Sequence, residues 1–252
     1  MERLKKKYRV EWFKETGELY QIQFALNRDR ATLYIDTSGE GLHKRGYRAK
    51  GNVAPIRETL AAAMVDIARY RGKGEFLDPF CGSGTIAIEA ALAAKNRAPG
   101  INRHFQAETW RWLDNSIWEK ARQEARDKEF SGEYLIFASD IDEKCVALST
   151  ENARKAGVGS MIRFSQGDAR KLARSTDRGV IVTNPPYGER LLEKKQAEEL
   201  YADFGKALEA LEGWYVYILS SHTEFERSFG RNADKKRKLY NGMIKCDLFM
   251  YN

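Results

Sequence analysis

The sequence is poor in cysteine, in proline and in long hydrophobic runs. Its 252 residues include three cysteines and five prolines. The cysteines Cys81, Cys145 and Cys246 are odd in number and far apart, which excludes a disulfide framework or a metal-binding cluster. No apolar run approaches the roughly 18 residues of a membrane span, and no apolar segment follows the basic N-terminus. We therefore expect a cytoplasmic protein with no membrane span, no secretory signal and no metal site.

Positive charge is concentrated at the two ends of the chain. The net charge is +7, and hydrophobic residues make up 42% of the sequence, an ordinary globular value. Residues 1–50 have a balance of +5 and residues 227–245 a balance of +6, while residues 51–226 are slightly acidic. Basic flanks suit a polyanionic partner such as nucleic acid. Solvated surface charge explains the same pattern equally well.

Hydrophobic periodicity indicates an α/β domain from about residue 53 onward. Strands alternate with helices there, which predicts a mostly parallel sheet covered by helices on both faces. Asn241-Gly242 predicts a hairpin turn that adds an antiparallel edge at the C-terminus. Strands are expected at 75–78, 134–139, 162–165, 180–183 and 215–219, and helices at 55 to about 70, 85–95, 143–156 and within 191–211.

We divide the chain into an N-terminal extension and one larger domain. Residues 1–52 contain a predicted hairpin, with strands at 20–26 and 31–36, followed by a polar connector. Residues 53–252 form the α/β domain. Within it, residues 96–131 are expected to be an insertion with a helix at 116–128.

Ligands of parallel sheets bind outside the carboxyl ends of the strands, so the turns there are the places to search. The first turn is Asp78-Pro79-Phe80-Cys81-Gly82-Ser83-Gly84. Two glycines separated by one residue allow a tight turn and a close approach of a ligand to the backbone. The helix that begins near Thr85 offers free N–H groups. No Gly-Lys-Ser/Thr follows, which excludes a Walker-type phosphate loop.

Acidic residues follow the next two strands. Asp140 could accept hydrogen bonds from the hydroxyls of a ribose, as acids do at this point of dinucleotide folds. Asp142 is expected to cap the following helix. The alternative that both acids merely start the helix stays open. Asp168 could accept a hydrogen bond from an adenine amino group, although its loop alone is a common one.

The fourth turn is Thr183-Asn184-Pro185-Pro186-Tyr187-Gly188. Two consecutive prolines fix an extended turn and hold two acceptors in place, the Asn184 side chain and the Pro185 carbonyl. Tyr187 adds a flat ring beside them. Such a turn can hold a planar heterocycle by its exocyclic amine. It leaves the lone pair of the nitrogen free for an electrophile.

Together these turns resemble the motifs of a known enzyme family. Asp-Pro-Phe-Cys-Gly-Ser-Gly-Thr followed by Asn-Pro-Pro-Tyr-Gly is similar to S-adenosylmethionine-dependent amino-methyltransferases of the class I, Rossmann-like fold. The segments at 36–48 (Asp-Thr-Ser-Gly to Leu-His-Lys-Arg-Gly-Tyr-Arg) and 57–62 (Arg-Glu-Thr-Leu-Ala-Ala) bring the resemblance closer to bacterial guanine-N2 methyltransferases of large-subunit (23S) ribosomal RNA, long labelled N6-adenine-specific DNA methylases. The resemblance runs from about residue 20 to the end.

The resemblance implies a role for each matching residue. It implies S-adenosylmethionine as the cofactor and S-adenosylhomocysteine as the product. Asn184, Pro185, Pro186 and Tyr187 would hold the target base. The residues that would bind the cofactor are Asp78, Phe80, Gly82, Gly84, Thr85, Asp140, Asp168, Asn184, Arg57 and Glu58. From the two basic segments, the residues expected to contact nucleic acid are Lys44, Arg45, Tyr47, Arg48, Lys235, Lys236 and Arg237.

RNA, most simply ribosomal RNA, is the partner that this resemblance implies. Such enzymes usually carry an RNA-binding THUMP domain upstream, for which there is no room in 252 residues. Two other functions stay open. One is adenine-N6 methylation of DNA, since Asn-Pro-Pro-Tyr serves adenine amines equally well. The other is a nucleic-acid-binding module without activity, against which the intact acids Asp78, Asp140 and Asp168 argue.

Overall fold

The structure is a computed structural model that describes residues 1–48, 56–187 and 194–252. The chain divides into two compact units. The smaller unit contains Met1–Gly41 and His104–Ala121, and the larger contains Leu42–Arg103 and Arg122–Asn252. Among the residues described, no helix combines the length and the apolar character that crossing a membrane requires.

The larger unit is built on a seven-stranded sheet with the order β5-β4-β3-β6-β7-β9-β8. The first five strands in this order are parallel, and β9 and β8 add an antiparallel edge. This confirms the predicted fold class. The strands are β3 (Glu75–Asp78), β4 (Leu135–Asp140), β5 (Ile162–Gln166), β6 (Gly179–Thr183), β7 (Trp214–Ser220), β8 (Lys235–Asn241) and β9 (Ile244–Tyr251).

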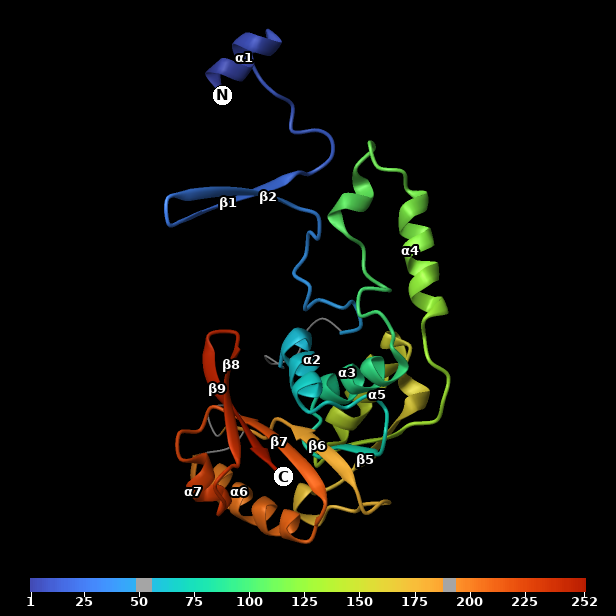
Figure 1. The fold of residues 1–252 in the computed structure, drawn as a ribbon, viewed down its shortest axis with the longest axis vertical. Coiled ribbons are helices and arrows are strands. Elements are labelled where there is room, and N and C mark those ends of the chain that lie inside the picture. The colour runs from blue at the N-terminus through green and yellow to red at the C-terminus, as the bar shows by residue number, and fades with distance from the viewer. Residues whose placement is uncertain (49–55, 188–193) are drawn as a thin grey trace. The chain divides into compact units, whose positions relative to one another are not determined.

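Helices cover both faces of this sheet (Figure 1). The helices α2 (Glu58–Ile67), α3 (Thr85–Lys95) and α5 (Glu143–Ala156) lie on one face, and α6 (Lys194–Glu209) and α7 (Phe225–Phe229) lie on the other. The short 3-10 helices η2 (Gly159–Met161) and η3 (Ala169–Lys171) flank β5.

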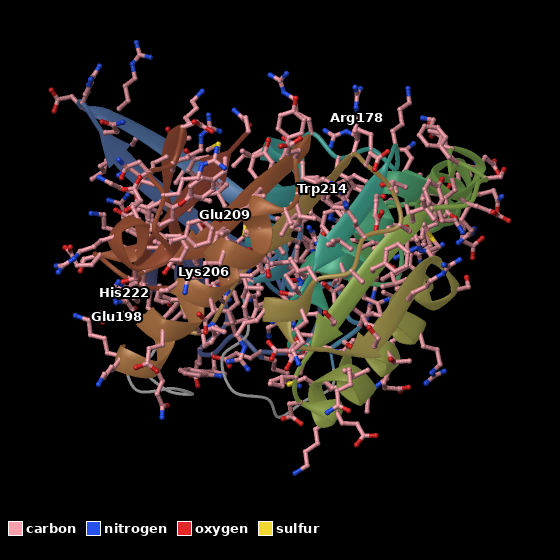
Figure 2. All side chains as sticks on the ribbon, turned by 90° about the horizontal axis from the view of Figure 1, so that it is seen from below. Arg178, Glu198, Lys206, Glu209, Trp214 and His222 are labelled. Atoms are coloured by element: carbon pink, nitrogen blue, oxygen red, sulfur yellow. The ribbon has the colours of Figure 1, made fainter. Side chains whose placement is uncertain are left out.

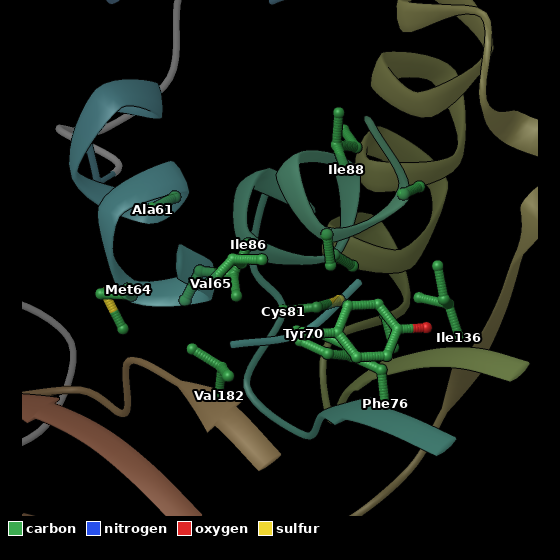
Figure 3. Close-up of a cluster of buried hydrophobic side chains, with 14 of the residues drawn as sticks. Ala61, Met64, Val65, Tyr70, Phe76, Cys81, Ile86, Ile88, Ile136 and Val182 are labelled. Atoms are coloured by element: carbon green, nitrogen blue, oxygen red, sulfur yellow. The ribbon is translucent and has the colours of Figure 1, made fainter. Parts of the chain in front are cut away.

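Successive strand residues point to opposite faces of the sheet, so each strand contributes to two separate cores. On β3, Phe76 packs in the first cluster, with α2 and α3, and Leu77 packs in the second, with α6. Figure 3 shows the first cluster, in which Tyr70 and Phe76 lie with their ring centroids 4.8 Å apart. Burial on both faces makes β3 a fixed support for the turn that follows it.

The smaller unit contains α1 (Glu2–Tyr8), a two-stranded hairpin of β1 (Gln21–Asn27) and β2 (Arg30–Asp36), and the 3-10 helix η1 (Gln106–Thr109). Trp110 anchors the second segment of this unit to the first. Its ring stacks on Tyr20 at 4.9 Å, and its Nε1 donates to the Leu19 carbonyl at 3.0 Å. The helix α4 (Ser116–Asp127) begins in this unit and ends in the larger one.

Most element boundaries lie close to the sequence predictions, and two features differ. The helix α2 ends at Ile67 instead of about Tyr70, because Arg69 has a positive φ of 55°. Pro55, expected in its first turn, lies outside the described residues, as do the first residues expected before α6. The hairpin loop is Gly242-Met243, since Asn241 pairs with Ile244. Gly242 has a φ of 66° at the first loop position, where a type II′ turn requires glycine.

Candidate active site

The candidate site lies at the carboxyl ends of β3, β4 and β6. The chain moves from β3 to β4 and β5 on one side and later returns to β6 on the other side. Ligands of open α/β sheets bind where the strand order reverses in this way. Asp78 ends β3, Asp140 ends β4, and Asn184 directly follows β6. The topology therefore brings three of the predicted turns together at the carboxyl ends of these neighbouring strands.

The glycine turn after β3 has the backbone geometry that a ligand cradle needs. Gly82 and Gly84 both have positive φ, 52° and 79°. A Cβ on Gly82 would meet nothing within 4 Å, so its backbone faces open space. A Cβ on Gly84 would lie 2.7 Å from the Ser149 Cβ of α5. The first glycine thus leaves room for a ligand, and the second lets two helices approach each other.

Asp78 is buried, with 1% of its surface exposed. Its Oδ1 accepts a hydrogen bond from the Thr183 hydroxyl at 2.7 Å. Its Oδ2 has no hydrogen-bond partner among the described residues. Burial raises the pKa of Asp78 to about 7, against the lowering effect of the hydrogen bonds from Thr183 and the Phe80 backbone. An unpaired buried carboxylate oxygen fits a cationic ligand group, such as the ammonium of an amino acid.

Asp140 is connected directly to the glycine turn. Its Oδ2 accepts from the Gly82 N–H at 2.9 Å, and its Oδ1 accepts from the Asp142 N–H at 3.0 Å. A carboxylate has about four lone-pair positions, so Asp140 retains acceptors for ribose hydroxyls. The Asp142 side chain accepts from the Lys144 N–H at 2.9 Å and caps α5. The two acids have different structural positions, as predicted.

Asp168 follows β5 and caps η3. Its carboxylate accepts from the Arg170 Nη2 at 2.7 Å and from the Arg170 backbone N–H at 3.0 Å. The hydrogen bond from the Arg170 side chain lowers the pKa of Asp168, which keeps this group ionised. Gly167 donates to the Asp140 carbonyl at 3.0 Å, so this loop adjoins the end of β4.

The turn after β6 is held at both ends. Thr183 bonds to Asp78 at its start, and the Tyr201 hydroxyl donates to the Pro186 carbonyl at 2.6 Å. The Tyr187 hydroxyl donates to Asn184 Oδ1 and lies 3.7 Å from Cys246 Sγ. The ring of Tyr187 also packs against the first hydrophobic cluster. Gly188, the last residue of the predicted motif, lies outside the described residues.

Two residues support this turn in ways that the sequence did not predict, Thr183 and Tyr201. Thr183 was predicted only as the first residue of the turn, and Tyr201 only as part of the helix expected within 191–211. Its ring also meets the edge of the His222 ring at 5.6 Å, and His222 Nε2 lies 3.0 Å from Glu198 Oε1. Figure 2 shows Glu198 and His222 beside each other. Only the fold brings these residues from α6 and the segment after β7 to one place.

The remaining residues predicted to bind the cofactor have contacts of several kinds. Phe80 meets the Phe204 ring edge-on at 5.1 Å in the second core. Thr85 Oγ1 accepts from Arg48 Nη2 at 2.8 Å, and the same guanidinium lies 3.4 Å from Glu58 Oε1. Arg57 is exposed at the start of α2. Their roles in cofactor binding stay predictions.

Of the residues predicted to contact nucleic acid, three turn inward. Tyr47 is buried and donates to Glu89 at 3.1 Å, and Arg45 forms an ion pair with the same carboxylate at 3.4 Å. Arg48 is engaged with Glu58 and Thr85. Lys44 is exposed, as are Lys235, Lys236 and Arg237 on β8. Lys236 Nζ lies 2.6 Å from Glu226 Oε2.

The described residues contain no cluster of three or more His, Cys, Asp or Glu side chains that could hold a metal ion. The arrangement instead combines an open glycine backbone, a buried carboxylate with an unpaired oxygen, and a rigid turn rich in acceptors. It can bind a polar cofactor along the ends of β3 and β4. It can hold an amine donor next to that cofactor at the end of β6.

Comparison with known proteins gives consistent matches. Residues 45–249 match the family described as "RMKL-like, methyltransferase domain". The chain is 50% identical over 242 residues to "Putative RNA methyltransferase YpsC" of Bacillus subtilis, covering 96% of this chain and 63% of the relative. It is 40% identical over 227 residues to "Ribosomal RNA large subunit methyltransferase K/L" of Shewanella baltica, covering 87% of this chain and 32% of the relative.

This chain is also similar to a solved structure. The crystal structure of SMU.472 in complex with SAH superposes with a TM-score of 0.89 at 38% identity, covering 99% of this chain and 66% of that one. This chain therefore spans less than two thirds of the length of each of these three proteins.

Proposed function

This chain belongs to the RMKL-like methyltransferase domain family, and on that basis we propose that it methylates the exocyclic amine of a base in RNA with S-adenosylmethionine as the methyl donor. The single observation that carries the proposal is the Asp78–Thr183 hydrogen bond of 2.7 Å. It joins the acid of the glycine turn to the residue that precedes Asn184. One buried contact therefore joins the turn that would bind the cofactor to the turn that would hold the base.

The residues at the ends of β3, β4 and β5 fit the cofactor. Asp78 Oδ2 would bind its ammonium group, and the open backbone at Gly82 would lie along its methionine portion. Asp140 would accept from the ribose hydroxyls, and Asp168 from the adenine amino group. The bound cofactor supplies a methyl group on a sulfonium, which is already a strong electrophile. The chain's own task is therefore to position the amine and expose its lone pair.

Asn184 and Pro185 would take the two N–H groups of the target amine. An amide oxygen has two lone pairs, and Tyr187 uses one of those on Asn184 Oδ1. The other remains for the amine, together with the Pro185 carbonyl. Accepting both protons keeps the nitrogen lone pair out of the base plane and available for attack. Electrostatic positioning of this kind is a large part of catalysis in preorganised sites.

The finer proposal is that the target is guanine N2 of large-subunit ribosomal RNA. It is supported by the names of relatives such as the K/L enzyme and by the motifs at 36–48 and 57–62. A base in folded RNA must leave its stack to reach such a turn, and the Tyr187 ring offers a surface beside it. Adenine N6 in DNA is the competing target, and the assay below separates the two.

The test is transfer of labelled methyl from S-adenosylmethionine to ribosomal RNA, genomic DNA or protein. We expect label in RNA only, located on one nucleotide after digestion. Asn184→Ala should lower the transfer rate at least 100-fold, since it removes an acceptor from the base-binding turn. Calorimetry should show cofactor affinity largely intact for this variant, since Asn184 would act mainly on the base. Label in DNA alone would refute the RNA proposal, and lost cofactor binding would refute the role of Asn184.

A further inference from the structure

The candidate active site lies at the carboxyl ends of the parallel strands, and the β8–β9 hairpin extends beyond these ends. The strand β9 is antiparallel to β7, and Ser220 at the carboxyl end of β7 pairs with Asp247. The strand β9 begins three residues earlier, at Ile244. At about 3.3 Å per residue, the hairpin continues roughly 10 Å past Ser220. Figure 1 shows it, in red, projecting from its end of the sheet.

One face of this hairpin is anchored to the domain beside the site. Leu239 and Ile244 pack against the first hydrophobic cluster. Cys246 Sγ lies 3.7 Å from the Tyr187 hydroxyl, which itself bonds to Asn184. These contacts fix the hairpin next to the turn that we propose binds the target base.

The opposite face carries an exposed aromatic ring between cationic side chains. Alternation along the strand puts Lys238 and Tyr240 on this face, and Tyr240 pairs across the hairpin with Lys245. Tyr240 is 59% exposed, and Met243 in the loop is 98% exposed. The span 235–245 contains five basic residues and no acidic residue. The acid on this face is Asp247, which pairs with Lys238.

We propose that the β8–β9 hairpin binds the RNA nucleotides next to the target base. Tyr240 stacks on an unpaired base, and Lys238 and Lys245 contact phosphates. An exposed ring flanked by cations is the combination by which proteins bind single-stranded nucleic acid. The inference rests on the proposed function, because it takes the Asn184–Tyr187 turn as the position of the target base. It adds a surface that selects and orients the RNA on either side of the target base.

The charge part of this proposal is tested with two matched double variants of the full chain. The first, Lys238→Gln with Lys245→Gln, removes two charges from the face that carries Tyr240. The control, Lys128→Gln with Lys206→Gln, removes two exposed charges from other surfaces. Fluorescence anisotropy measures the affinity for a labelled single-stranded RNA at several salt concentrations. We expect at least a tenfold loss of affinity for the hairpin variant, with the slope of log K against log salt reduced by about 1.

The stacking part is tested by a pair of substitutions at one position. Tyr240→Ala should weaken RNA binding about tenfold, and Tyr240→Phe should keep most of the affinity, because stacking needs the ring and not the hydroxyl. Both variants should bind S-adenosylmethionine as the wild type does.

The outcomes separate this inference from the proposed function. Equal RNA affinities for the hairpin and control variants would overturn the inference even if the wild type methylates RNA. Tighter binding to DNA than to RNA of the same sequence would also overturn it. Absence of methyl transfer, with RNA binding that depends on the hairpin, would support the inference and refute the proposed function.

Discussion

Asp78 ends a strand that is buried on both faces, and the surrounding protein compensates its charge only in part. Thr183 and the Phe80 N–H stabilise the carboxylate, whereas burial and the nearby Asp140 disfavour it. A fold selected only for stability would place an apolar residue here. A group of this kind is typical of a binding site, because a cationic ligand completes its surroundings. Function therefore explains a residue that packing alone does not.

The raised pKa of Asp78 predicts how stability changes with pH. Its pKa is about 7 in the folded chain, whereas an ordinary aspartate has a pKa of about 4. The folded state therefore binds the proton more tightly, and stability falls as the pH rises from about 4 to about 7. The full cost of ionising Asp78, about 4 kcal/mol, is present above pH 7.

Asp78→Asn should remove that cost, because an amide carries no charge at any of these pH values. In urea denaturation without cofactor, we expect the variant to be more stable than the wild type at pH 8. The difference should shrink steadily toward pH 4. A constant difference across this range would show that Asp78 does not titrate as described. The variant should also lose cofactor affinity, which calorimetry measures independently.

At the scale of elements, the sequence predicted strands and helices well where burial is periodic. The strand β3 and the helices α3 and α5 have the expected bounds, since apolar runs, glycines and caps coincide there. The helix α1 was not expected, because none of its residues is buried and periodicity has nothing to detect. The position of the turn at Gly242 depends on strand register, which composition does not specify.

In the candidate site, too, the sequence did not predict contacts between residues that are far apart in the chain. The turns were recognised from residue types alone, but their supports were not. Tyr201 lies 15 residues after Pro186, and Thr183 lies 105 residues after Asp78. Arg45 and Tyr47 were interpreted as a basic surface, and their buried partner Glu89 lies more than 40 residues away. Long-range polar pairs of this kind leave no periodic signal in the sequence.

The helix α6 should affect catalysis through Tyr201. Tyr201→Phe keeps the buried ring and removes the hydrogen bond to the Pro186 carbonyl. One such bond contributes about 1 kcal/mol, so we expect a three- to tenfold slower methyl transfer at saturating cofactor. Cofactor affinity should not change. Leu208→Ala in the same helix is the control, because Leu208 packs against the second hydrophobic cluster and its side chain cannot form a hydrogen bond with the turn. An equal effect of both variants would indicate general loosening of α6.

At the scale of the whole molecule, the two units differ in how their apolar side chains are buried. The larger unit has two cores, one on each face of its sheet. In the smaller unit, the β1–β2 hairpin exposes every apolar residue of one face. Register puts Ile22, Phe24, Leu33 and Ile35 on that face, each at least 61% exposed. Such a face is uncommon in a two-stranded ribbon, which is marginally stable without further packing.

That exposed face predicts self-association of this chain in solution. Phe24 and Leu33 pair across the two strands, so Phe24→Lys with Leu33→Lys puts two charges at the centre of the face. Sedimentation velocity at increasing concentration should show association of the wild type and its loss in this variant. Gln23→Lys with Thr32→Lys adds the same charge to the polar face of the hairpin and should leave association unchanged. Equal sedimentation of the two variants would assign the effect to net charge, whereas loss in the first alone assigns it to burial of apolar surface.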